Sequence, residues 1–318
     1  MNTRYGGPEV VEVRSAPKPE PTETELLVRV HATTVNRTDC GMRTPYPLFA
    51  RAFIGLRKPK VNILGLDFAG EVEAVGAKVT SFDRGDKVFG LSPNTFGAHA
   101  EYLCAPEDGP IATMPAGVAF DEAAPIEGAW YADGILRAFG LGSGHTILIY
   151  GASGAIGTAA VQLAKSYGAT VTAVCASPHI ELAESIGADR VIDYESQDFT
   201  AIGETFDFVL DAVGKSSYFR CRRLLKSGGV FSATDLGPWG QVALLAIWSS
   251  IIGSGRVIFP LPKASKAFIE FLKARIEAGE YRAVIDRRYA LDEIVEAYRY
   301  VETGQKVGNV VIDVTSSE

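Results

Sequence analysis

The chain has few cysteines, and no two of them stand close together in the sequence. Four cysteines in 318 residues do not predict a disulfide framework. Without a Cys-x-x-Cys pair they form neither a dithiol redox centre nor a compact cysteine zinc knuckle. We therefore expect a reducing, intracellular environment. The four residues are Cys40, Cys104, Cys175 and Cys221.

Long apolar runs are also absent. A helix that crosses a bilayer needs about 20 apolar residues, whereas the strongest run, residues 242–252, is shorter and contains two serines. This run favours a buried helix or a contact between subunits over a helix on a membrane surface. The N-terminal residues have no apolar stretch behind their charge and are unlike a secretory signal. We expect a cytoplasmic protein without a membrane partner.

An excess of positive charge is missing as well. Lys and Arg number 31 against 38 Asp and Glu, which gives a formal net charge of −7. Proteins that bind nucleic acids by releasing counterions present a basic face, so we expect no nucleic-acid partner. The composition is otherwise that of a globular protein, with 47% hydrophobic and 22% charged residues.

Short alternating segments fill the first third of the chain. Between residues 17 and 115, apolar and polar residues alternate in runs bounded by glycine and proline. This period of two is typical of half-buried strands. It predicts an all-β unit, which we interpret as a partly open barrel.

The pattern changes after residue 115, where short β-rich runs alternate with helical patterns. Repeated strand–helix units of this kind build a parallel, doubly wound sheet with helices on both faces, so the expected fold class is α/β. The β-rich runs lie at residues 146–150, 170–175, 190–193, 206–210 and 229–233.

The chain is long enough for about two domains of about 150 residues each. A last β-rich run at residues 309–314 could return to the first domain, which would make that domain discontinuous. We therefore predict one domain from residues 1–115 and 263–318, and a second from residues 116–262.

A glycine-rich turn of sequence GASGAIG, residues 151–157, follows the first of these β-rich runs and opens a helix. Turns in this position hold the diphosphate of a dinucleotide. Gly154 would let the backbone approach the diphosphate, and Gly157 would let helix and strand pack closely. The alternative is a small-residue turn without a ligand. The candidate cofactor-binding residues here are Ala152, Ser153, Gly154, Ala155, Ile156 and Gly157.

The residues after the second β-rich run distinguish NADPH from NADH. Sites that prefer NADH carry an Asp or Glu about 20 residues beyond the glycine turn, which would repel a 2′-phosphate. No carboxylate stands in this loop, which contains Cys175, Ser177 and His179. A neutral loop favours NADPH, with Ser177 and His179 as phosphate contacts. Ser177 could instead cap the following helix.

Several short motifs occur in a fixed order along nearly the whole chain. Together they resemble the medium-chain dehydrogenase/reductase superfamily, and within it the zinc-free quinone oxidoreductase (zeta-crystallin-like) branch. The motifs are RYGGPEV at 4–10, VNRTD at 35–39, LGLDFAG at 64–70, RGDKV at 84–88, the glycine turn, GAD at 187–189, VIDY at 191–194, DAVG at 211–214 and GNVVI at 308–312.

The resemblance implies a fold and a reaction. It implies a GroES-like, partly open β-barrel domain, a Rossmann domain, and a cleft between them where NADPH delivers a hydride. Zinc alcohol dehydrogenases of the superfamily have a cysteine where this chain has Asn36 and a histidine where it has Leu66, and Cys104 stands alone where a structural zinc is held. We therefore expect no metal. Without a Lewis acid, the expected acceptor is already electrophilic: a quinone or an α,β-unsaturated carbonyl.

The resemblance also implies site residues. Asn36 would donate a hydrogen bond into the cleft, and Arg43 and Tyr46 would come from the following loop. Tyr46 is either a proton donor or a residue that packs the loop. Asp39 and Asp67 are interpreted as structural carboxylates.

Further candidates lie in the second domain. Tyr194 would contact the phosphate side of the adenosine or be an aromatic at the sheet edge, and Val213 and Gly214 of the DAVG motif would adjoin the cofactor. Trp239 and Trp248, with the apolar run, would cover the cleft or form a homodimer contact. The pocket should then suit a small hydrophobic substrate.

Trp130 departs from the family pattern. It replaces the threonine of a Gly-x-Thr-Ala motif near the nicotinamide. A tryptophan there could block the cleft, which keeps open a second hypothesis: a non-catalytic NADPH-binding protein with a structural or regulatory role.

Overall fold

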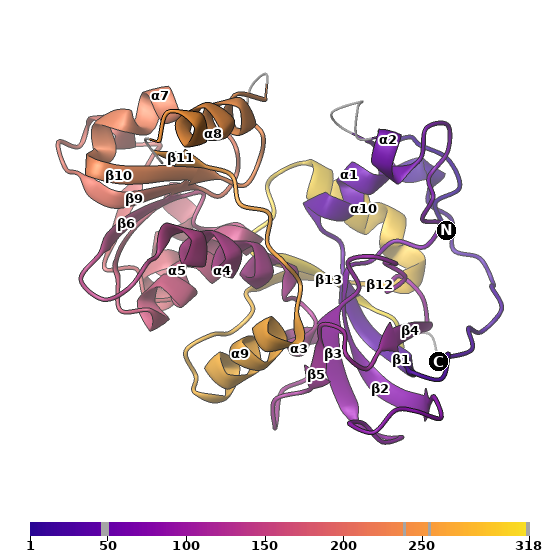
Figure 1. Cartoon of the computed structure of the whole chain (residues 1–318). Coiled ribbons are helices and arrows are strands. Elements are labelled where there is room, and N and C mark those ends of the chain that lie inside the picture. Colours follow the sequence, from indigo (N-terminus) through magenta and orange to yellow (C-terminus); the bar gives the residue numbers. More distant parts are fainter. Residues whose placement is uncertain (46–50, 238–239, 254–255, 316–318) are drawn as a thin grey trace. The chain divides into compact units, whose positions relative to one another are not determined.

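A computed structural model of the chain describes residues 1–45, 51–237, 240–253 and 256–315. It divides into two compact units, Met1–Glu127 with Ala264–Glu318, and Gly128–Lys263 (Figure 1). Residues 116–127 lie in the first unit, whereas the sequence placed them in the second. The reason is that α3 (Phe120–Ala123) packs on the sheet of the first unit.

The first unit is built on a seven-stranded sheet in the order β12-β13-β1-β2-β3-β5, with β4 paired to β1. Neighbouring strands are antiparallel except β12 and β13. The end of β1 pairs with β13, which places Thr33 opposite Ile312 and confirms that the last strand returns to this unit. The strands are β1 (Glu25–Thr34), β2 (Asp67–Val75), β3 (Lys87–Leu91), β4 (Tyr102–Pro106), β5 (Ile111–Thr113), β12 (Ile285–Ala290) and β13 (Asn309–Asp313).

Helix α10 (Ile294–Glu302) shows why this unit has one core. Its buried residues Ile294, Ala297, Tyr298 and Val301 follow the spacing i, i+3, i+4, i+7 of one helix face. That face packs against the hydrophobic residues of the sheet. The remaining helices of the unit are α1 (Arg37–Arg43), α2 (Arg51–Ile54), α3 and α9 (Lys266–Glu277).

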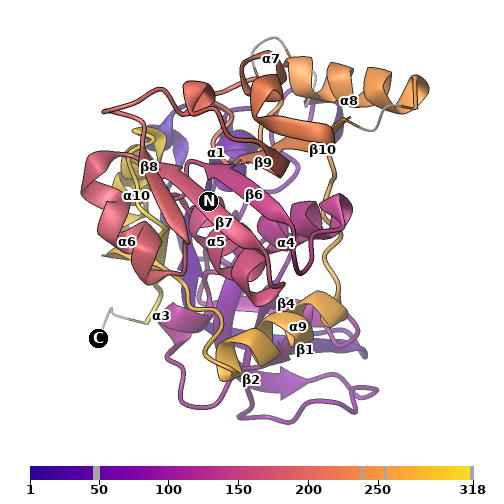
Figure 2. The same ribbon diagram turned by 90° about the vertical axis from the view of Figure 1, so that its left-hand side faces the viewer.

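The second unit contains a six-stranded sheet in the order β11-β10-β9-β6-β7-β8 (Figure 2). Every neighbouring pair in it is parallel, which confirms the predicted doubly wound sheet. The strands are β6 (Thr146–Tyr150), β7 (Thr170–Cys175), β8 (Arg190–Asp193), β9 (Phe206–Asp211), β10 (Leu225–Ala233) and β11 (Val257–Ile258). The helices are α4 (Glu127–Phe139), α5 (Ala155–Ser166), α6 (Ile180–Ser185), α7 (Tyr218–Cys221) and α8 (Gln241–Ile251).

The strand order reverses between β6 and β9. The chain runs outward from β6 through β7 to β8 and then returns to form β9 on the other side of β6. In open parallel sheets, ligands bind at such a reversal, outside the carboxyl ends of the strands. The topology therefore directs attention to the residues that follow β6, β7 and β9.

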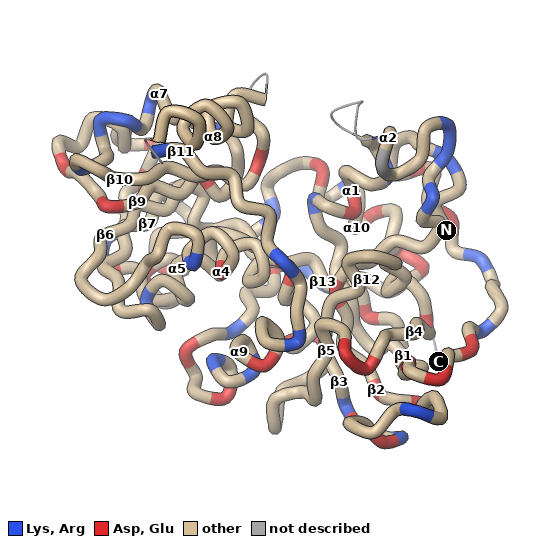
Figure 3. The backbone as a smooth tube through the Cα atoms, in the orientation of Figure 1, with Lys and Arg blue, Asp and Glu red and all other residues tan. Residues whose placement is uncertain are grey.

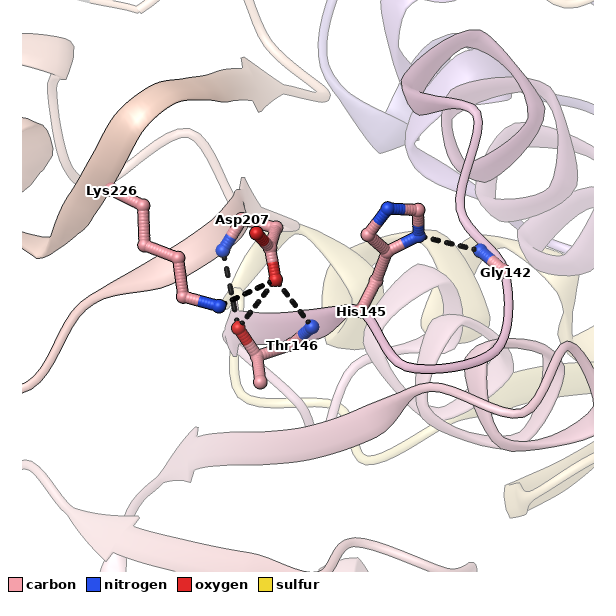
Figure 4. Close-up of polar contacts among 5 residues, drawn as sticks. All are labelled: Gly142, His145, Thr146, Asp207 and Lys226. Atoms are coloured by element: carbon pink, nitrogen blue, oxygen red, sulfur yellow. Dashed lines mark hydrogen bonds and ion pairs between the residues drawn. The ribbon is translucent and has the colours of Figure 1, made fainter.

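The opposite, amino edge of this sheet is held by a carboxylate. Asp207 accepts hydrogen bonds from the backbone N–H of Thr146 (2.8 Å), its hydroxyl (2.9 Å) and Lys226 Nζ (2.8 Å) (Figure 4). Burial favours a higher pKa for Asp207, but these donors outweigh it and lower the pKa to about 2. His145, beside Thr146, is half-buried and packs edge-on against Phe208.

Helix α8 is apolar and exposed. Leu244 is 64% and Ile251 73% exposed, and no charged residue occurs along the helix (Figure 3). Of the two expected alternatives, the buried helix is therefore wrong, and the contact between subunits stays a prediction. Among the described residues, no helix combines the length and the apolar character needed to cross a bilayer.

Candidate functional site

The glycine-rich turn connects β6 to α5 at the carboxyl edge of the parallel sheet. Gly151 has a φ of +79°, which favours glycine. The backbone N–H groups of Gly151 and Ala152 donate to the carbonyl of Val174 at 3.0 and 3.1 Å. The turn is thus fixed to the end of the neighbouring strand, β7.

Gly157 and Gly154 differ in what surrounds them. A Cβ atom on Gly157 would lie 2.1 Å from the carbonyl oxygen of Gly151, so this glycine is required for the packing of α5 on the turn. A Cβ on Gly154 would meet only that same oxygen, at 3.7 Å. Gly154 is the N-cap residue of α5, where the first N–H groups of a helix have no partner within the helix. A helix N-terminus with unpartnered N–H groups is suited to an anionic group such as a diphosphate.

The loop after β9 lies against this turn. A Cβ on Gly151 would approach Val213 Cγ1 to 2.5 Å, so Val213 packs directly on the glycine. Asp211 holds the loop by accepting hydrogen bonds from the backbone N–H groups of Val213 (3.0 Å) and Gly214 (2.8 Å). The structure therefore brings these predicted residues together at the strand reversal.

The loop after β7 is neutral in its own residues, as expected, but it lies against two carboxylates from the end of β8 and the loop that follows. The hydroxyl of Ser177 lies 2.8 Å from Asp193 Oδ2 and 2.7 Å from Glu195 Oε2, and the Ser177 backbone N–H also donates to Glu195 (3.1 Å). Ser177 thus binds two carboxylates rather than capping the next helix. The NADPH prediction considered only the residues of this loop and not the carboxylates of its neighbour, and the preference for NADPH stays a prediction. Buried Cys175 ends β7, and half-buried His179 ends the short 3-10 helix that Ser177 begins.

Sequence reasoning missed Asp193 and Glu195 because Asp193 ends β8 and Glu195 follows it, whereas the search was limited to the loop after β7. Strand register brings them close, since Asp193 lies opposite Cys175 in the parallel pair. A signal was present in the sequence: the two acids flank Tyr194 at the end of the third β-rich run.

Tyr194 lines a pocket of about 340 Å³ in the same unit. Its side chain is 45% exposed. Tyr150 and Phe199, whose rings stack at 4.7 Å, form an apolar wall of the pocket, and Glu195 and Arg220 line it as well. The pocket therefore adjoins the acidic pair through Glu195.

In the first unit, Asn36 is buried in a polar cluster. Its side-chain Nδ2 donates to Thr34 Oγ1 (2.5 Å), and its backbone N–H donates to Asp39 Oδ2 (3.0 Å). Thr34 in turn donates to Asp67 (2.5 Å). The predicted role of Asn36, a donor to substrate, remains a prediction.

Asp39 and Asp67 bind backbone groups, as structural carboxylates do. Asp39 accepts from the N–H of Gly65 (2.9 Å), and Asp67 accepts from those of Ile126 and Glu127 (3.2 Å each). Burial raises the pKa of Asp39 to about 7 and that of Asp67 to about 6. Asp39 and Asp67 therefore keep their protons to a higher pH than exposed aspartates do.

Glu127 joins this cluster and was not singled out from the sequence. Thr38 donates to its Oε1, whereas its buried Oε2 has no hydrogen-bond partner among the described residues. Burial, with the charges of Asp39 and Asp67, raises its pKa. Burial also lowers the pKa of nearby Lys306 to about 8. The sequence did contain a signal for Glu127, because it directly precedes Gly128, the first residue of the motif in which Trp130 replaces threonine.

Arg43 is not a loop residue, which corrects the sequence-based placement. It lies in the last turn of α1 and is fully buried. Its guanidinium donates to the carboxylate of Glu302 and the carbonyl of Gly6, and it lies 5.1 Å from the ring centre of Tyr298. These contacts are typical of a structural residue, and the predicted catalytic role of Arg43 stays a prediction. Tyr46 and Trp239 lie outside the described residues.

The residues at the expected zinc positions do not suit a metal. Leu66 is 2% exposed and has no ligating atom, and the amide of Asn36 is bound to Thr34. Over the described parts of the chain, no three His, Cys, Asp or Glu side chains are grouped to hold a metal ion.

Trp130 lies in the first turn of α4, next to α5. A Cβ on Gly128 would lie 2.6 Å from the carbonyl oxygen of Ala155, so the two helices begin side by side. The indole Nε1 of Trp130 is buried and has no hydrogen-bond partner in the described part of the chain, and its ring packs on Tyr131 at 4.9 Å.

Two family models match the chain. The model of the alcohol dehydrogenase GroES-like domain matches residues 22–116, and that of zinc-binding dehydrogenases matches residues 186–312. Both the barrel-like first unit and the parallel-sheet unit are thus similar to parts of known dehydrogenases.

Similar proteins extend over nearly the whole chain. A 2-methylene-furan-3-one reductase of Solanum lycopersicum is 31% identical over 98% of this chain and 77% of its own length. A chloroplastic quinone-oxidoreductase homolog of Spinacia oleracea is 30% identical over 97% of this chain and 95% of its own. The solved structure of the quinone oxidoreductase from Coxiella burnetii has a TM-score of 0.86 at 28% identity and covers 98% of this chain and 97% of its own.

Proposed function

Because the chain belongs to the medium-chain dehydrogenase/reductase superfamily, in its quinone oxidoreductase-like branch, we propose that it reduces a quinone or an α,β-unsaturated carbonyl. Its fold, a GroES-like domain with a Rossmann-like parallel-sheet domain, is that of the superfamily. The hydride would come from a reduced nicotinamide dinucleotide. The observation that carries this proposal is the open glycine turn at the N-terminus of α5.

The chain's own residues would bind and orient the cofactor. A bound nicotinamide dinucleotide supplies the hydride. The first turn of α5 would hold its diphosphate through free N–H groups and the positive end of the helix dipole. Val213, packed on Gly151, would keep the turn in shape. Positioning of this kind supplies much of the rate in hydride transfer.

Two relatives and the residues at the expected metal positions support the proposed substrate class. The tomato relative is named for a ring with a methylene group beside a ketone, and the spinach relative is named a quinone-oxidoreductase homolog. With Leu66 and Asn36 at the expected ligand positions, no zinc would acidify an alcohol. An acceptor that is already electrophilic needs no such activation.

The test follows oxidation of NADH and NADPH against a panel of quinones, enals and enones, with and without EDTA. We expect turnover with at least one acceptor and no effect of EDTA. If a dinucleotide binds and no acceptor is reduced, the reductase proposal is wrong and the non-catalytic reading, motivated by Trp130, takes its place. Activity that EDTA removes and zinc restores would overturn the metal-free part.

A further inference from the structure

The adenosine end of the proposed dinucleotide site contains an acidic pair, Asp193 and Glu195. Asp193 is the last residue of β8, and Glu195 lies two residues further along the chain. Asp193 lies opposite Cys175 at the ends of the paired strands β8 and β7. Adjacent strands lie about 4.8 Å apart. The pair therefore stands beside the position where a dinucleotide site ordinarily carries its ribose-binding carboxylate.

The carboxyl end of β7 is also bound to the glycine turn. Val174, next to Cys175, accepts the backbone hydrogen bonds of Gly151 and Ala152. On the other side, the backbone N–H of Tyr194 donates to the carbonyl of Cys175 (3.1 Å). The end of β7 thus connects the diphosphate turn with the acidic pair through backbone contacts within one unit.

The carboxylate oxygens of Asp193 and Glu195 can accept more hydrogen bonds than the side chain of Ser177 can donate. Ser177 has one hydroxyl proton, and both Asp193 Oδ2 (2.8 Å) and Glu195 Oε2 (2.7 Å) lie within reach of it. A hydroxyl donates its proton to one acceptor at a time. A ribose with free 2′- and 3′-hydroxyls would bring two more donors, which is the complement that two carboxylates need.

A 2′-phosphate would bring negative charge and hydrogen-bond acceptors to the pair instead of donors. A phosphate monoester carries a charge of about −1.5 to −2 near neutral pH and is then a poor donor. The hydrogen bonds from Ser177 and from the backbone N–H of Glu195 lower the pKa of Asp193, so this carboxylate is ionised at neutral pH. Like charges placed together disfavour binding.

No cation among the described residues is ion-paired to Asp193 or Glu195. Arg220 lines the same pocket as Glu195, and its guanidinium lies 4.0 Å from Asp198. Arg220 is therefore already beside a carboxylate of its own.

From this geometry we propose that Asp193 and Glu195, held by Ser177, select NADH over NADPH. The proposal rests on one part of the proposed function, namely that a dinucleotide binds at the N-terminus of α5. It reverses the cofactor preference that the sequence of the β7 loop suggested.

The experiment measures binding by calorimetry on the full chain, without an acceptor substrate. The probes are NADH, NADPH, ADP-ribose and 2′-phospho-ADP-ribose. We expect the wild type to bind NADH at least about tenfold more tightly than NADPH, and ADP-ribose more tightly than its 2′-phosphate. In Asp193→Asn/Glu195→Gln, NADPH should bind about tenfold or more tightly than in the wild type, and NADH within about threefold of it.

Glu204→Gln is the matched control. It removes one negative charge from an ion pair with Arg190 ahead of β9, at the amino edge of the sheet, and should leave the ratio of affinities unchanged. Equal affinity of the wild type for NADH and NADPH, or an unchanged ratio in the double variant, would overturn the proposal and leave the reductase function standing. NADH preference without turnover of any acceptor would support the selectivity and reject the function. Binding of neither dinucleotide would reject both.

Discussion

Gly154 and Gly157 lie three residues apart in one turn, but they should respond to substitution in different ways. A Cβ on Gly154 enters open space, whereas a Cβ on Gly157 collides with the backbone of Gly151 and Ala152. We predict that Gly154→Asp folds normally and loses dinucleotide binding by about a hundredfold or more, because its carboxylate would occupy the diphosphate position.

Gly157→Ala should instead lower stability by about 2 kcal/mol or more, through strain between α5 and the turn. Thermal unfolding and calorimetric titration of both variants distinguish these outcomes. Normal binding by Gly154→Asp would show that the turn does not hold the diphosphate.

Asp67 gives the stability of the first unit a pH dependence. Burial raises its folded-state pKa to about 6, above about 3.9 in an unfolded chain. The folded state therefore keeps a proton that the unfolded state has released. The resulting stability, about 3 kcal/mol, is fully present below about pH 4 and is lost as the pH rises through 6.

Asp67→Asn tests this dependence. An amide can satisfy the same partners, since its oxygen accepts the two backbone N–H groups and its nitrogen donates to Thr34. We predict that the loss of stability between pH 4.5 and 7.5, a window of about three units around these pKa values, is smaller in the variant by about 2 kcal/mol. Urea unfolding at the two pH values measures it. His99, whose pKa burial lowers to about 4, acts in the opposite direction in both proteins. Equal slopes would refute the prediction.

At the scale of elements, Arg43 connects α1 to α10. Its buried guanidinium binds Glu302, whose side chain is 34% exposed. Removal of Glu302 leaves a buried charge unpaired, whereas removal of Arg43 leaves a carboxylate that water can reach. We predict that Glu302→Ala costs about 3 kcal/mol and that Arg43→Met costs less.

The same two variants test the structural role of Arg43. Both should keep the turnover number of the wild type when it is measured on folded protein below the unfolding temperature. A fall of more than about tenfold in Arg43→Met, with its stability retained, would return Arg43 to the catalytic residues.

Local patterns predicted most elements closely because their cause is local. Residues 146–150, 170–175 and 190–193 form strands with the bounds that the alternation of β-rich and helical runs indicated. The run at 242–252 does form a helix, but its burial could not be predicted. Apolar composition alone does not say whether another part of the chain covers a helix face.

At the scale of the whole molecule, α8 presents an uncovered apolar face. Leu244, Ile247, Trp248 and Ile251, each more than half exposed, follow the spacing of one helix face. On its other side, Ser249 accepts a hydrogen bond from the backbone of Val257 in β11, the edge strand of the sheet. We propose that a second copy of the chain covers this face, since an apolar helix face continuous with an open sheet edge is suited to a homodimer.

Light scattering coupled to gel filtration tests the dimer. The wild type should have twice the mass of the 34.0 kDa chain, and Trp248→Glu should be monomeric at micromolar concentration. Phe219→Glu, which changes an aromatic on α7 that is 57% exposed, is the control and should remain dimeric. A monomeric wild type would refute the proposal.

The sequence by itself determined the two-part architecture, the parallel sheet, the glycine turn and the family resemblance. These depend on periodicity and on motifs of neighbouring residues, which a single chain displays directly. It could not reveal the partners of buried groups. Arg43 reaches Glu302 across 259 positions of sequence, and the contact exists only because α1 and α10 pack together.

Only the tertiary structure decided the character of the cofactor loop. Residues 175–179 are neutral in the sequence, but the register of β7 with β8 places Asp193 opposite Cys175 and leads Glu195 to Ser177. Charge acts through space and not along the chain. The order of strands in the sheet, rather than the loop's own residues, therefore sets the electrostatic environment of the ribose.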